Sequence, residues 1–396
     1  MGGDVLALLA PGQGAQTPGM LVPWLDDDEI AATLRWSAAV TGLDLVALGT
    51  TGSADDIRDT AVAQPLLVAL ALAVGQRLLH STDFPILAGH SVGEFAAAAL
   101  AGALSPETAL TLVRERGRLM AAASAEPPTG MSAVLGGDAG EVAAVLDRHG
   151  LTAANVNTAG QVVAAGRLDV LEALAADPPE RARIRPLQVA GAFHTDFMAS
   201  ARDSLGELAD RAPRTDPSRT LLGNGDGAVV RAGDDVVRRL VAQVAQPVRW
   251  DLCMATLTDL GVTATVELAP GGTLTGLVRR AMPGVETLAI TTPDDLAAAR
   301  AMLDRHAVAT TEPAPSWRLA VAPVAGTFRR TDAEPGTTLA AGAPLGVVVS
   351  NRSESAVEAV HGGVLVEWLA YDGDPVSPGQ PVARLHPLSA DAAVFA

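Results

Sequence analysis

The segment at residues 85–104, PILAGHSVGEFAAAALAGAL, constrains the fold of this chain more than any other part of it. Residues 85–89 predict a short buried strand that runs directly into Ser91, and an alanine-rich helix is expected over about residues 92–103. A strand that turns tightly into a helix needs small neighbours at the turn, and Gly89 and Gly93 supply them. The segment therefore predicts an α/β fold in which the Ser91 hydroxyl stands between the end of a strand and the start of a helix.

Strands and helices alternate through most of the first 305 residues. Residues 5–10 (VLALLA) predict a buried strand, and a helix begins after Ser105, an N-cap residue followed by Pro106 at the first helical position. Residues 128–190 differ, because their short strands and helices follow one another like a small α+β insert. The alternation then resumes, and it predicts a mainly parallel sheet.

The composition changes again at residue 306. Residues 306–317 are rich in Pro, Thr and Ala and predict a linker. Residues 318–388 combine short apolar strands with Gly and Pro turns, which predicts a separate all-β domain. Residues 389–396 are expected to form a frayed tail.

Charge and composition narrow the functional class. All 28 Lys or Arg positions are arginine, so Schiff-base lysines, the P-loop lysine and lysine-linked prosthetic groups are excluded. The formal net charge of −17 disfavours nucleic acid and anionic membranes as partners. The most apolar run, residues 65–74, has the length of a core helix rather than of a membrane span. Cys253 is the single cysteine, which excludes an internal disulfide and fits a reducing cytoplasm.

Residues 89–93, GHSVG, fit the G-x-S-x-G pattern of a nucleophilic serine, although a second interpretation is open. The helix N-terminus directs free N–H groups and a partial positive charge at any oxyanion formed beside Ser91, as acyl transfer requires. Alternatively, Ser91 is an N-cap flanked by glycines that let the helix pack closely. A serine nucleophile also needs a base, so the assignment depends on the histidines.

His194 is the strongest candidate for that base among the seven histidines. It lies in VAGAFHTDFM, residues 189–198, a loop after an expected strand where small and apolar neighbours can hold an imidazole beside a cleft. A structural role is the alternative. His90 adjoins Ser91, but adjacent side chains on a turn diverge. The other five lie at expected helix ends, in the linker or in the β-domain: His80, His149, His306, His361 and His386.

Five segments match a known family in order and spacing: APGQGAQTPGM, AGHSVGEFAAA, VRERGRLM, AGAFHTDFM, and QVAQPVRWDLCM continuing to GVTATVELAPGGTLTGLVRR. Together they resemble the malonyl-CoA:acyl carrier protein transacylases, most closely the actinobacterial members. The resemblance covers about residues 4–305. It implies an α/β-hydrolase-like large subdomain with an inserted ferredoxin-like small subdomain, which coincides with the insert at residues 128–190.

The resemblance implies a catalytic dyad and an oxyanion hole. Ser91 is the implied nucleophile and His194 its general base, and main-chain carbonyls near Gln243 fix the imidazole tautomer in place of the acid of a triad. The backbone N–H groups of Gln13 and Val92 are implied to bind the oxyanion. The implied reaction is ping-pong transfer of a malonyl group from malonyl-CoA to the phosphopantetheine thiol of acyl carrier protein, through a malonyl-serine, for fatty acid or polyketide synthesis.

Arg116 is implied to bind the free carboxylate of the malonyl group. A buried guanidinium binds a carboxylate through two hydrogen bonds and stays charged, so it disfavours acyl groups that lack the carboxylate. Arg114, Arg116 and Arg118 alternate along one expected helix and cannot share a face, and Gly117 is expected to leave room for the ligand. Without the resemblance, these arginines would be interpreted as a solvated helix face.

The remaining site expectations are these. His90 is implied to line the site. The GAFH segment with Phe193 resembles the malonyl-selective form of this loop, which implies a preference for malonyl over methylmalonyl groups. Three polar residues of the insert are interpreted as turn formers rather than cleft-lining groups: Asn155, Asn157 and Gln161. No metal and no cofactor is expected. Because the carrier proteins of such systems are acidic, docking is expected to use local arginines, at residues 181–185 or 279–280.

Residues 318–388 resemble a biotinyl/lipoyl carrier domain, through LAVAPVAGTFRR (residues 319–330) and VEAVHGGVLVEWLAYDGDPVSPGQPVARL (residues 357–385). The hairpin position that carries the modified lysine in such domains corresponds to Arg352, in the segment before Gly363. Biotin and lipoate are therefore excluded here. The domain is expected to stabilise the enzyme or to dock a partner.

Two alternatives to malonyl transfer stay open at this point. A serine esterase or thioesterase of the α/β-hydrolase kind places an acidic residue between its serine and a late histidine, whereas the histidine here comes early and Arg116 would have no role. A non-catalytic scaffold that recruits partners through the carrier-like domain is the second alternative, and the pairing of Ser91 with His194 disfavours it.

Overall fold

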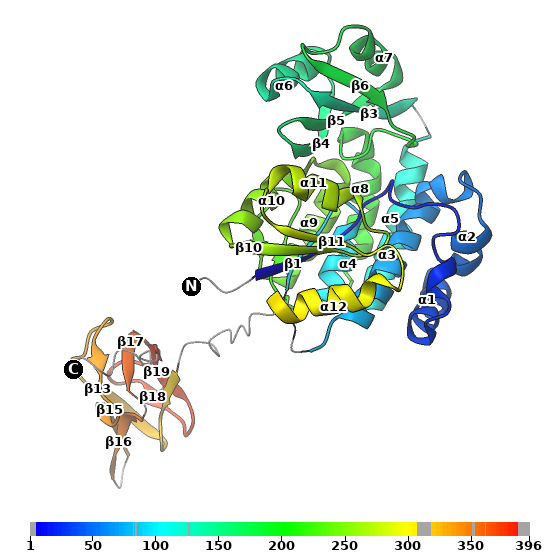
Figure 1. The fold of residues 1–396 in the computed structure, drawn as a ribbon. Helices are drawn as coiled ribbons and strands as arrows, with labels where there is room; N and C mark the ends of the chain where they lie inside the picture. Colours follow the sequence, from blue (N-terminus) through cyan, green and yellow to red (C-terminus); the bar gives the residue numbers. More distant parts are fainter. Residues whose placement is uncertain are drawn as a thin grey trace. The chain divides into compact units, whose positions relative to one another are not determined.

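A six-stranded sheet forms the centre of the first of two units in the computed structural model (Figure 1). The strand order is β11-β10-β1-β2-β7-β8, with every neighbouring pair parallel except β7 and β8. The strands are β1 (Val5–Ala10), β2 (Ile86–Gly89), β7 (Leu221–Leu222), β8 (Val229–Val230), β10 (Val262–Glu267) and β11 (Glu286–Ala289). The expected α/β fold with a mainly parallel sheet is confirmed.

Helices cover both faces of this sheet. Alternate residues of β1 lie in two different hydrophobic cores. Leu6, Leu8 and Ala10 belong to the first core, and Ala7 and Leu9 belong to the second. Both faces are therefore buried, as a parallel sheet requires. The first core also holds residues of α1 (Asp28–Thr41), α2 (Leu45–Thr51), α3 (Thr60–Leu78), α4 (Gly93–Leu100), α5 (Pro106–Ala123), α8 (Ala199–Ala209), α9 (Gly233–Ala242) and α12 (Asp295–His306); the second holds α10 (Trp250–Asp259) and α11 (Thr273–Ala281).

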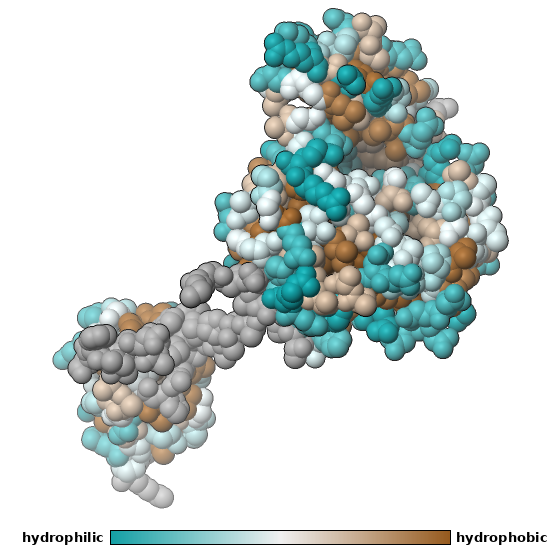
Figure 2. All heavy atoms as spheres, viewed as in Figure 1, coloured by the Kyte–Doolittle hydropathy of each residue, from teal (hydrophilic) through white to brown (hydrophobic). Residues whose placement is uncertain are grey.

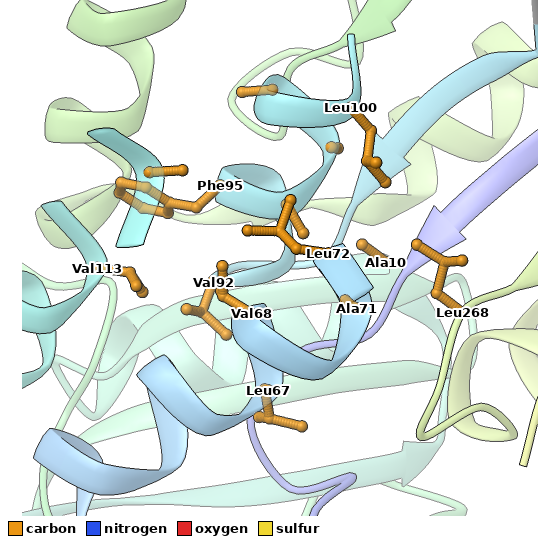
Figure 3. Packing of buried hydrophobic residues seen from close by; sticks show 14 of the residues in the cluster. Ala10, Leu67, Val68, Ala71, Leu72, Val92, Phe95, Leu100, Val113 and Leu268 are labelled. Atoms are coloured by element: carbon orange, nitrogen blue, oxygen red, sulfur yellow. The ribbon is translucent and has the colours of Figure 1, made fainter. Parts of the chain in front are cut away.

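The long apolar helix α3 supports the segment that carries Ser91. Leu67, Val68 and Leu72 of α3 belong to the same core as Val92 and Phe95, which lie one and four residues after the serine (Figure 3). In the described part of the chain, α3 alone is long and apolar enough to cross a membrane, but 78% of that stretch is buried in the protein. It is therefore a core helix, as its length in the sequence indicated.

A smaller five-stranded sheet, ordered β6-β3-β5-β4-β9, forms the small subdomain. Its elements are β3 (Thr129–Gly136), α6 (Ala139–Arg148), β4 (Thr152–Thr158), β5 (Gln161–Arg167), α7 (Leu168–Ala176), β6 (Ala182–Pro186) and β9 (Val248–Arg249). The last strand lies outside the expected range 128–190 and pairs in parallel with β4. It ties the insert to the large subdomain, and Figure 2 shows hydrophobic residues gathered where the two meet.

The second unit is built from two four-stranded sheets, ordered β12-β19-β17-β14 and β16-β15-β13-β18. A core of its own joins them, centred on Phe328 and Trp368. The strands are β12 (Arg318–Val321), β13 (Gly326–Arg330), β14 (Thr338–Leu339), β15 (Ala343–Val349), β16 (Glu354–Ala359), β17 (Gly363–Trp368), β18 (Pro375–Val376) and β19 (Pro381–His386).

The structure describes residues 5–306 and 318–386, apart from residues 82, 84, 126, 351, 352 and 361. The expected linker, the tail at 389–396 and Arg352 therefore lie outside the described residues, with one exception. His306, placed at the start of the linker from the sequence, is the last residue of α12, and its ring contacts Thr263 and Glu286. The helix continues because these contacts hold its last turn against β10 and β11.

Candidate active site

Ser91 stands at the carboxyl edge of the parallel sheet, where three neighbouring strands deliver loops. It follows β2, which lies between β1 and β7. The loop after β1 carries Gln13, and the loop after β7 carries Asn224. Because parallel strands end at the same edge of a sheet, these loops flank Ser91 although they are far apart in sequence.

Close backbone contacts require the two glycines around Ser91. A Cβ atom at Gly89 would lie 2.1 Å from the Gly93 carbonyl carbon, and one at Gly93 would lie 2.3 Å from the Ala10 carbonyl oxygen. Ser91 itself has a φ of 51°. That left-handed conformation costs a residue with a side chain about 1–3 kcal/mol. The tight turn expected from the sequence is present, and it separates the hydroxyl from both the strand and the helix.

The Ser91 hydroxyl is hydrogen-bonded to His194. Ser91 Oγ lies 2.7 Å from His194 Nε2, and His194 Nδ1 lies 2.7 Å from the main-chain oxygen of Gln243. A carbonyl oxygen only accepts, so Nδ1 carries the proton and the Nε2 lone pair faces the serine hydroxyl. His194 also has a positive φ, 61°. Such an arrangement suits a serine and its general base.

Burial keeps the His194 imidazole neutral. His194 is 3% exposed, and burial together with the positive charge of Arg116 lowers the pKa of His194 to about 3. At neutral pH its Nε2 therefore carries no proton and is free to accept one. A carboxylate bound to Arg116 would offset the positive charge and make the imidazole more basic.

Arg116 brings a buried positive charge to the serine. It projects from α5, is 1% exposed, and its Nη2 lies 3.5 Å from Ser91 Oγ. Nη1 donates to Gln64 Oε1 and Nη2 donates to Gln243 Oε1, each at 2.7 Å, while Nε makes no hydrogen bond. Burial lowers the pKa of Arg116 to about 10, which leaves it charged at neutral pH. A guanidinium has five N–H donors, and three of them face Gln64, Gln243 and Ser91, so two remain without a partner.

Gly117 does not open space for a ligand, contrary to the expectation from the sequence. A Cβ atom there would lie 2.7 Å from the Thr60 carbonyl oxygen, so the glycine lets α5 pack closely on α3. Arg114 donates to main-chain oxygens of α1 and α3, and Arg118 is exposed. Of the three alternating arginines, Arg116 alone turns toward the serine.

His90 is held between the small subdomain and α10. Its Nε2 lies 2.9 Å from Asn157 Oδ1, and its ring meets Trp250 edge-on with 5.6 Å between centroids. Burial lowers the pKa of His90. Asn155 and Asn157 lie in β4 and Gln161 in β5, so the interpretation of these three residues as turn formers was wrong.

The main-chain N–H groups of Gln13 and Val92 donate to no other residue in the described chain. Val92 directly precedes α4, so its N–H belongs to the unpaired donors at a helix N-terminus. The Gln13 side chain donates to Thr60 Oγ1 at 3.3 Å. Phe193, next to His194, is 5% exposed and packs in the main core.

Asn224 fixes the turn that carries Ser91 and was not identified from the sequence. Its Oδ1 accepts from Ser91 N and its Nδ2 donates to Gly89 O, each at 2.7 Å. One amide therefore holds the backbone on both sides of the turn. The signal that could have identified it is its place two residues after the end of β7, once β7 is known to lie beside β2.

Two further buried side chains complete the polar network, and the sequence did not indicate either. Gln64 of α3 binds Arg116. Glu94, in the first turn of α4, accepts from Asn224 N at 2.7 Å and from Gln243 Nε2. Burial raises the pKa of Glu94 to about 7. Its place directly after GHSVG was the available signal.

The two arginine groups considered for carrier docking do not form one patch. Residues 182–185 belong to β6, an edge strand of the small sheet. Arg280 of α11 donates to Gln161 Oε1 at 3.2 Å, and α11 packs against β4, toward the other edge of that sheet. The sheet order thus separates the two candidates.

Comparisons with known proteins agree with this geometry. Residues 8–309 match the model of a family described as acyl transferase domain. The malonyl CoA-acyl carrier protein transacylase of Mycobacterium tuberculosis (strain ATCC 25618 / H37Rv) is 53% identical over 301 residues, which cover 74% of this chain and 98% of that protein. The enzyme of the same name from Bacillus subtilis (strain 168) is 32% identical over 300 residues, 74% of this chain and 95% of that protein.

Solved structures are similar over the same share of the chain. The crystal structure of MCAT from Mycobacterium tuberculosis has a TM-score of 0.73 at 51% identity, covering 75% of this chain and 100% of that one. A type II PKS acyl-carrier protein in complex with its malonyl-transacylase gives a TM-score of 0.71 at 28% identity, and the match covers 76% of this chain and 100% of that one. The chain therefore belongs to the acyl transferase family, among its malonyl CoA-acyl carrier protein transacylases.

Proposed function

We propose that the Ser91 site transfers a malonyl group from malonyl-CoA to the phosphopantetheine thiol of acyl carrier protein, through a malonyl-serine intermediate. The observation that carries the proposal is the 3.5 Å contact between Arg116 Nη2 and Ser91 Oγ. In a malonyl thioester, one methylene separates the carboxylate carbon from the thioester carbon. A carboxylate bound to Arg116 therefore brings the thioester carbon to the serine hydroxyl.

Acylation begins when Ser91 Oγ attacks the thioester carbon. His194 Nε2 takes the hydroxyl proton, and the Gln243 carbonyl stabilises the imidazolium through Nδ1–H. The N–H groups of Gln13 and Val92 bind the tetrahedral oxyanion. When the intermediate collapses, the carbon–sulfur bond breaks, and the leaving thiolate of CoA takes the proton from His194. A malonyl-serine ester remains.

The second half-reaction reverses these steps with a new thiol. The phosphopantetheine thiol of acyl carrier protein gives its proton to His194 and attacks the ester carbon. The carbon–oxygen bond to Ser91 breaks, and the serine oxygen takes the proton back. His90, held by Asn157, lines the same site, and we assign to Phe193, next to the base, the preference for malonyl over methylmalonyl groups. The product supplies fatty acid or polyketide synthesis.

The chemistry needs no metal and no cofactor in this scheme, because serine, imidazole and backbone amides perform each step. In the described residues, no three His, Cys, Asp or Glu side chains gather into a set that could hold a metal ion. We assign the reaction to the cytoplasm, where the free and buried Cys253 stays reduced.

A mass measurement tests the proposal. Incubation with malonyl-CoA alone should add about 86 Da to the intact protein, the mass of one malonyl group, and peptide mapping should place it on Ser91. Ser91→Ala is the matched control and should stay unmodified. A rapidly hydrolysed adduct would instead favour the thioesterase alternative, and wild-type protein without any adduct would refute the transfer mechanism.

We interpret the large subdomain as α/β-hydrolase-like, the insert as ferredoxin-like, and residues 318–386 as biotinyl/lipoyl-like. The strand–serine–helix turn supports the first, the antiparallel sheet with two helices the second, and the paired four-stranded sheets the third. Because the chain has no lysine, we assign the last domain to partner docking or stabilisation rather than to carrying a prosthetic group. Removing residues 309–396 should leave transfer in vitro largely intact, and loss of activity in a folded truncated protein would contradict this assignment.

A further inference from the structure

We propose that Glu94 is a positioning residue for malonyl recognition: its carboxylate fixes the Gln243 side-chain amide so that the amide oxygen faces Arg116. The inference rests on the proposed malonyl transfer, because it concerns the residue that would bind the acyl carboxylate. Glu94 lies outside the chemical steps described above, yet it is one of the few buried acids of the large subdomain.

The contacts of Gln243 define one orientation of its amide. Its Oε1 accepts from Arg116 Nη2 at 2.7 Å, and its Nε2 donates to a Glu94 carboxylate oxygen and to Ser91 O, the latter at 3.0 Å. A rotation of the amide by 180° would direct an NH2 group at the guanidinium and an oxygen at both the carboxylate and the carbonyl. Arg116 only donates and the Ser91 carbonyl only accepts, so both favour the observed orientation, and ionised Glu94, which also only accepts, holds the NH2 group in place with its charge.

The second oxygen of Glu94 secures the carboxylate to the serine turn. It accepts from the main-chain N–H of Asn224, whose side chain holds Ser91 N and Gly89 O. Glu94 therefore joins two parts of the site. One is the turn with the nucleophile, and the other is the segment at Gln243, whose carbonyl orients the base.

The charges around Glu94 explain why an amide stands between it and Arg116. Three groups face Glu94 from other elements: Arg116 of α5, Arg239 of α9 and Cys253 of α10. Burial raises the pKa of Cys253, so its thiol stays neutral. Arg239 is already paired with two aspartates, Asp226 and Asp235, at 2.7 and 3.0 Å.

Arg116 makes no direct ion pair within the described chain, so its charge is the one that Glu94 balances. A direct salt bridge would occupy two donors of the guanidinium. Acting through the Gln243 amide, Glu94 balances the charge while donors of Arg116 remain available for the malonyl carboxylate.

Glu94→Gln tests the inference, because it keeps the shape of the side chain and removes the charge that holds the Gln243 NH2 group. We expect KM for malonyl-CoA to rise about tenfold and the preference for malonyl over acetyl groups to fall about tenfold, with a smaller change in kcat. Glu267→Gln is the matched control. Glu267 is also a fully buried acid, but it caps α11 by accepting from Gly272, Leu274 and Thr275 amides.

The pH dependence provides a readout that a purely structural role would not move. Burial raises the pKa of Glu94 to about 7, whereas His194, with a pKa of about 3, does not titrate near neutrality. Lowering the pH from 8 to 6 protonates Glu94, so the malonyl preference of the wild type should fall over this interval. It should stay flat in Glu94→Gln. Glu94→Asp, which keeps the charge, should recover part of the preference.

The outcomes separate this inference from the function on which it rests. Wild-type protein that is not acylated by malonyl-CoA refutes the function. Normal acylation with equal behaviour of Glu94→Gln and Glu267→Gln overturns the role of Glu94. In a Gln243→Met background, Glu94→Gln should have no further effect on malonyl preference, and an additive effect would also overturn it. If Glu94→Gln does not fold, the wild-type pH series decides, since a flat preference between pH 6 and 8 contradicts the proposal.

Discussion

Removal of the Arg116 guanidinium should abolish the discrimination between malonyl and acetyl groups. Arg116 is almost completely buried, and its Nη2 is 3.5 Å from the serine oxygen. With Arg116→Ala, the malonyl carboxylate would enter the site without a partner. Losing one member of a buried charge pair costs about 3–5 kcal/mol. Since each 1.36 kcal/mol is a factor of ten, kcat/KM for malonyl-CoA should fall about 150- to 5,000-fold.

For acetyl-CoA, kcat/KM should rise rather than fall when Arg116 is replaced by alanine. In the wild type, an acetyl group offers no carboxylate to the remaining donors of the buried guanidinium, whereas Arg116→Ala has no such donors to leave unsatisfied. The ratio of kcat/KM for malonyl-CoA and acetyl-CoA, measured with acyl carrier protein as acceptor, should therefore fall further than the malonyl value alone. Arg118→Ala is the matched control, because Arg118 lies on the same helix but is exposed and pairs with Glu115. Such a surface change should alter either rate by less than about twofold.

An unchanged malonyl-to-acetyl ratio in folded Arg116→Ala would refute this account of selectivity. Folding has to be checked, because the substitution removes a partner from the Gln64 and Gln243 oxygens, each worth about 1–3 kcal/mol when left unpaired. The loss of a buried charge offsets part of that cost. Thermal unfolding of both arginine variants beside the wild type measures the balance.

Three further predictions follow from the geometry around the serine. His194→Ala should lower kcat by about 100- to 10,000-fold with little change in KM, and an unaffected rate of malonyl-serine formation would exclude His194 as the base. Gly93→Ala should lower the melting temperature strongly, because the new Cβ atom would collide with backbone atoms. Gly160→Ala is the control and should leave the melting temperature nearly unchanged, since no atom lies within 4 Å of the new Cβ. Equal effects of the two substitutions would contradict the tight turn. Because the folded-state pKa of Glu94 is raised from 4.5 to about 7, the native state binds the proton more tightly, so stability should fall by about 3 kcal/mol as the pH rises through that interval. Glu94→Gln should remove this slope in pH-dependent unfolding, and an unchanged slope would show that another group titrates.

Patterns among residues close together in sequence were sufficient to predict the strands, the helices and the turn that carries Ser91. The apolar run of β1, the N-cap of α5 at Ser105 and the strand before Ser91 depend on residues close together in sequence, and each is present in the structure. The side chain of Ser105 accepts from Thr108 N, as an N-cap should. The family resemblance then linked Ser91 to distant segments, which no spacing along the chain could have done.

The residues that escaped prediction depend on strand order and helix packing. Asn224 reaches Ser91 because β7 lies beside β2, and nothing in the sequence near Asn224 states which strands are neighbours. The same holds for β9, whose two residues join a sheet otherwise built from the insert. Gly117 was misread because the partner that requires a glycine there, the Thr60 carbonyl, is on another helix.

The position of Arg116 couples selection of the acyl group to catalysis. Its charge is one cause of the low pKa of His194, so the base is weakest while no acyl carboxylate is bound to the guanidinium. A malonyl carboxylate offsets that charge and strengthens the base at the moment when the thioester lies beside Ser91. An acetyl group does neither. A poor substrate therefore leaves donors of the buried guanidinium unsatisfied and meets a weaker base, so discrimination should appear in kcat as well as in binding.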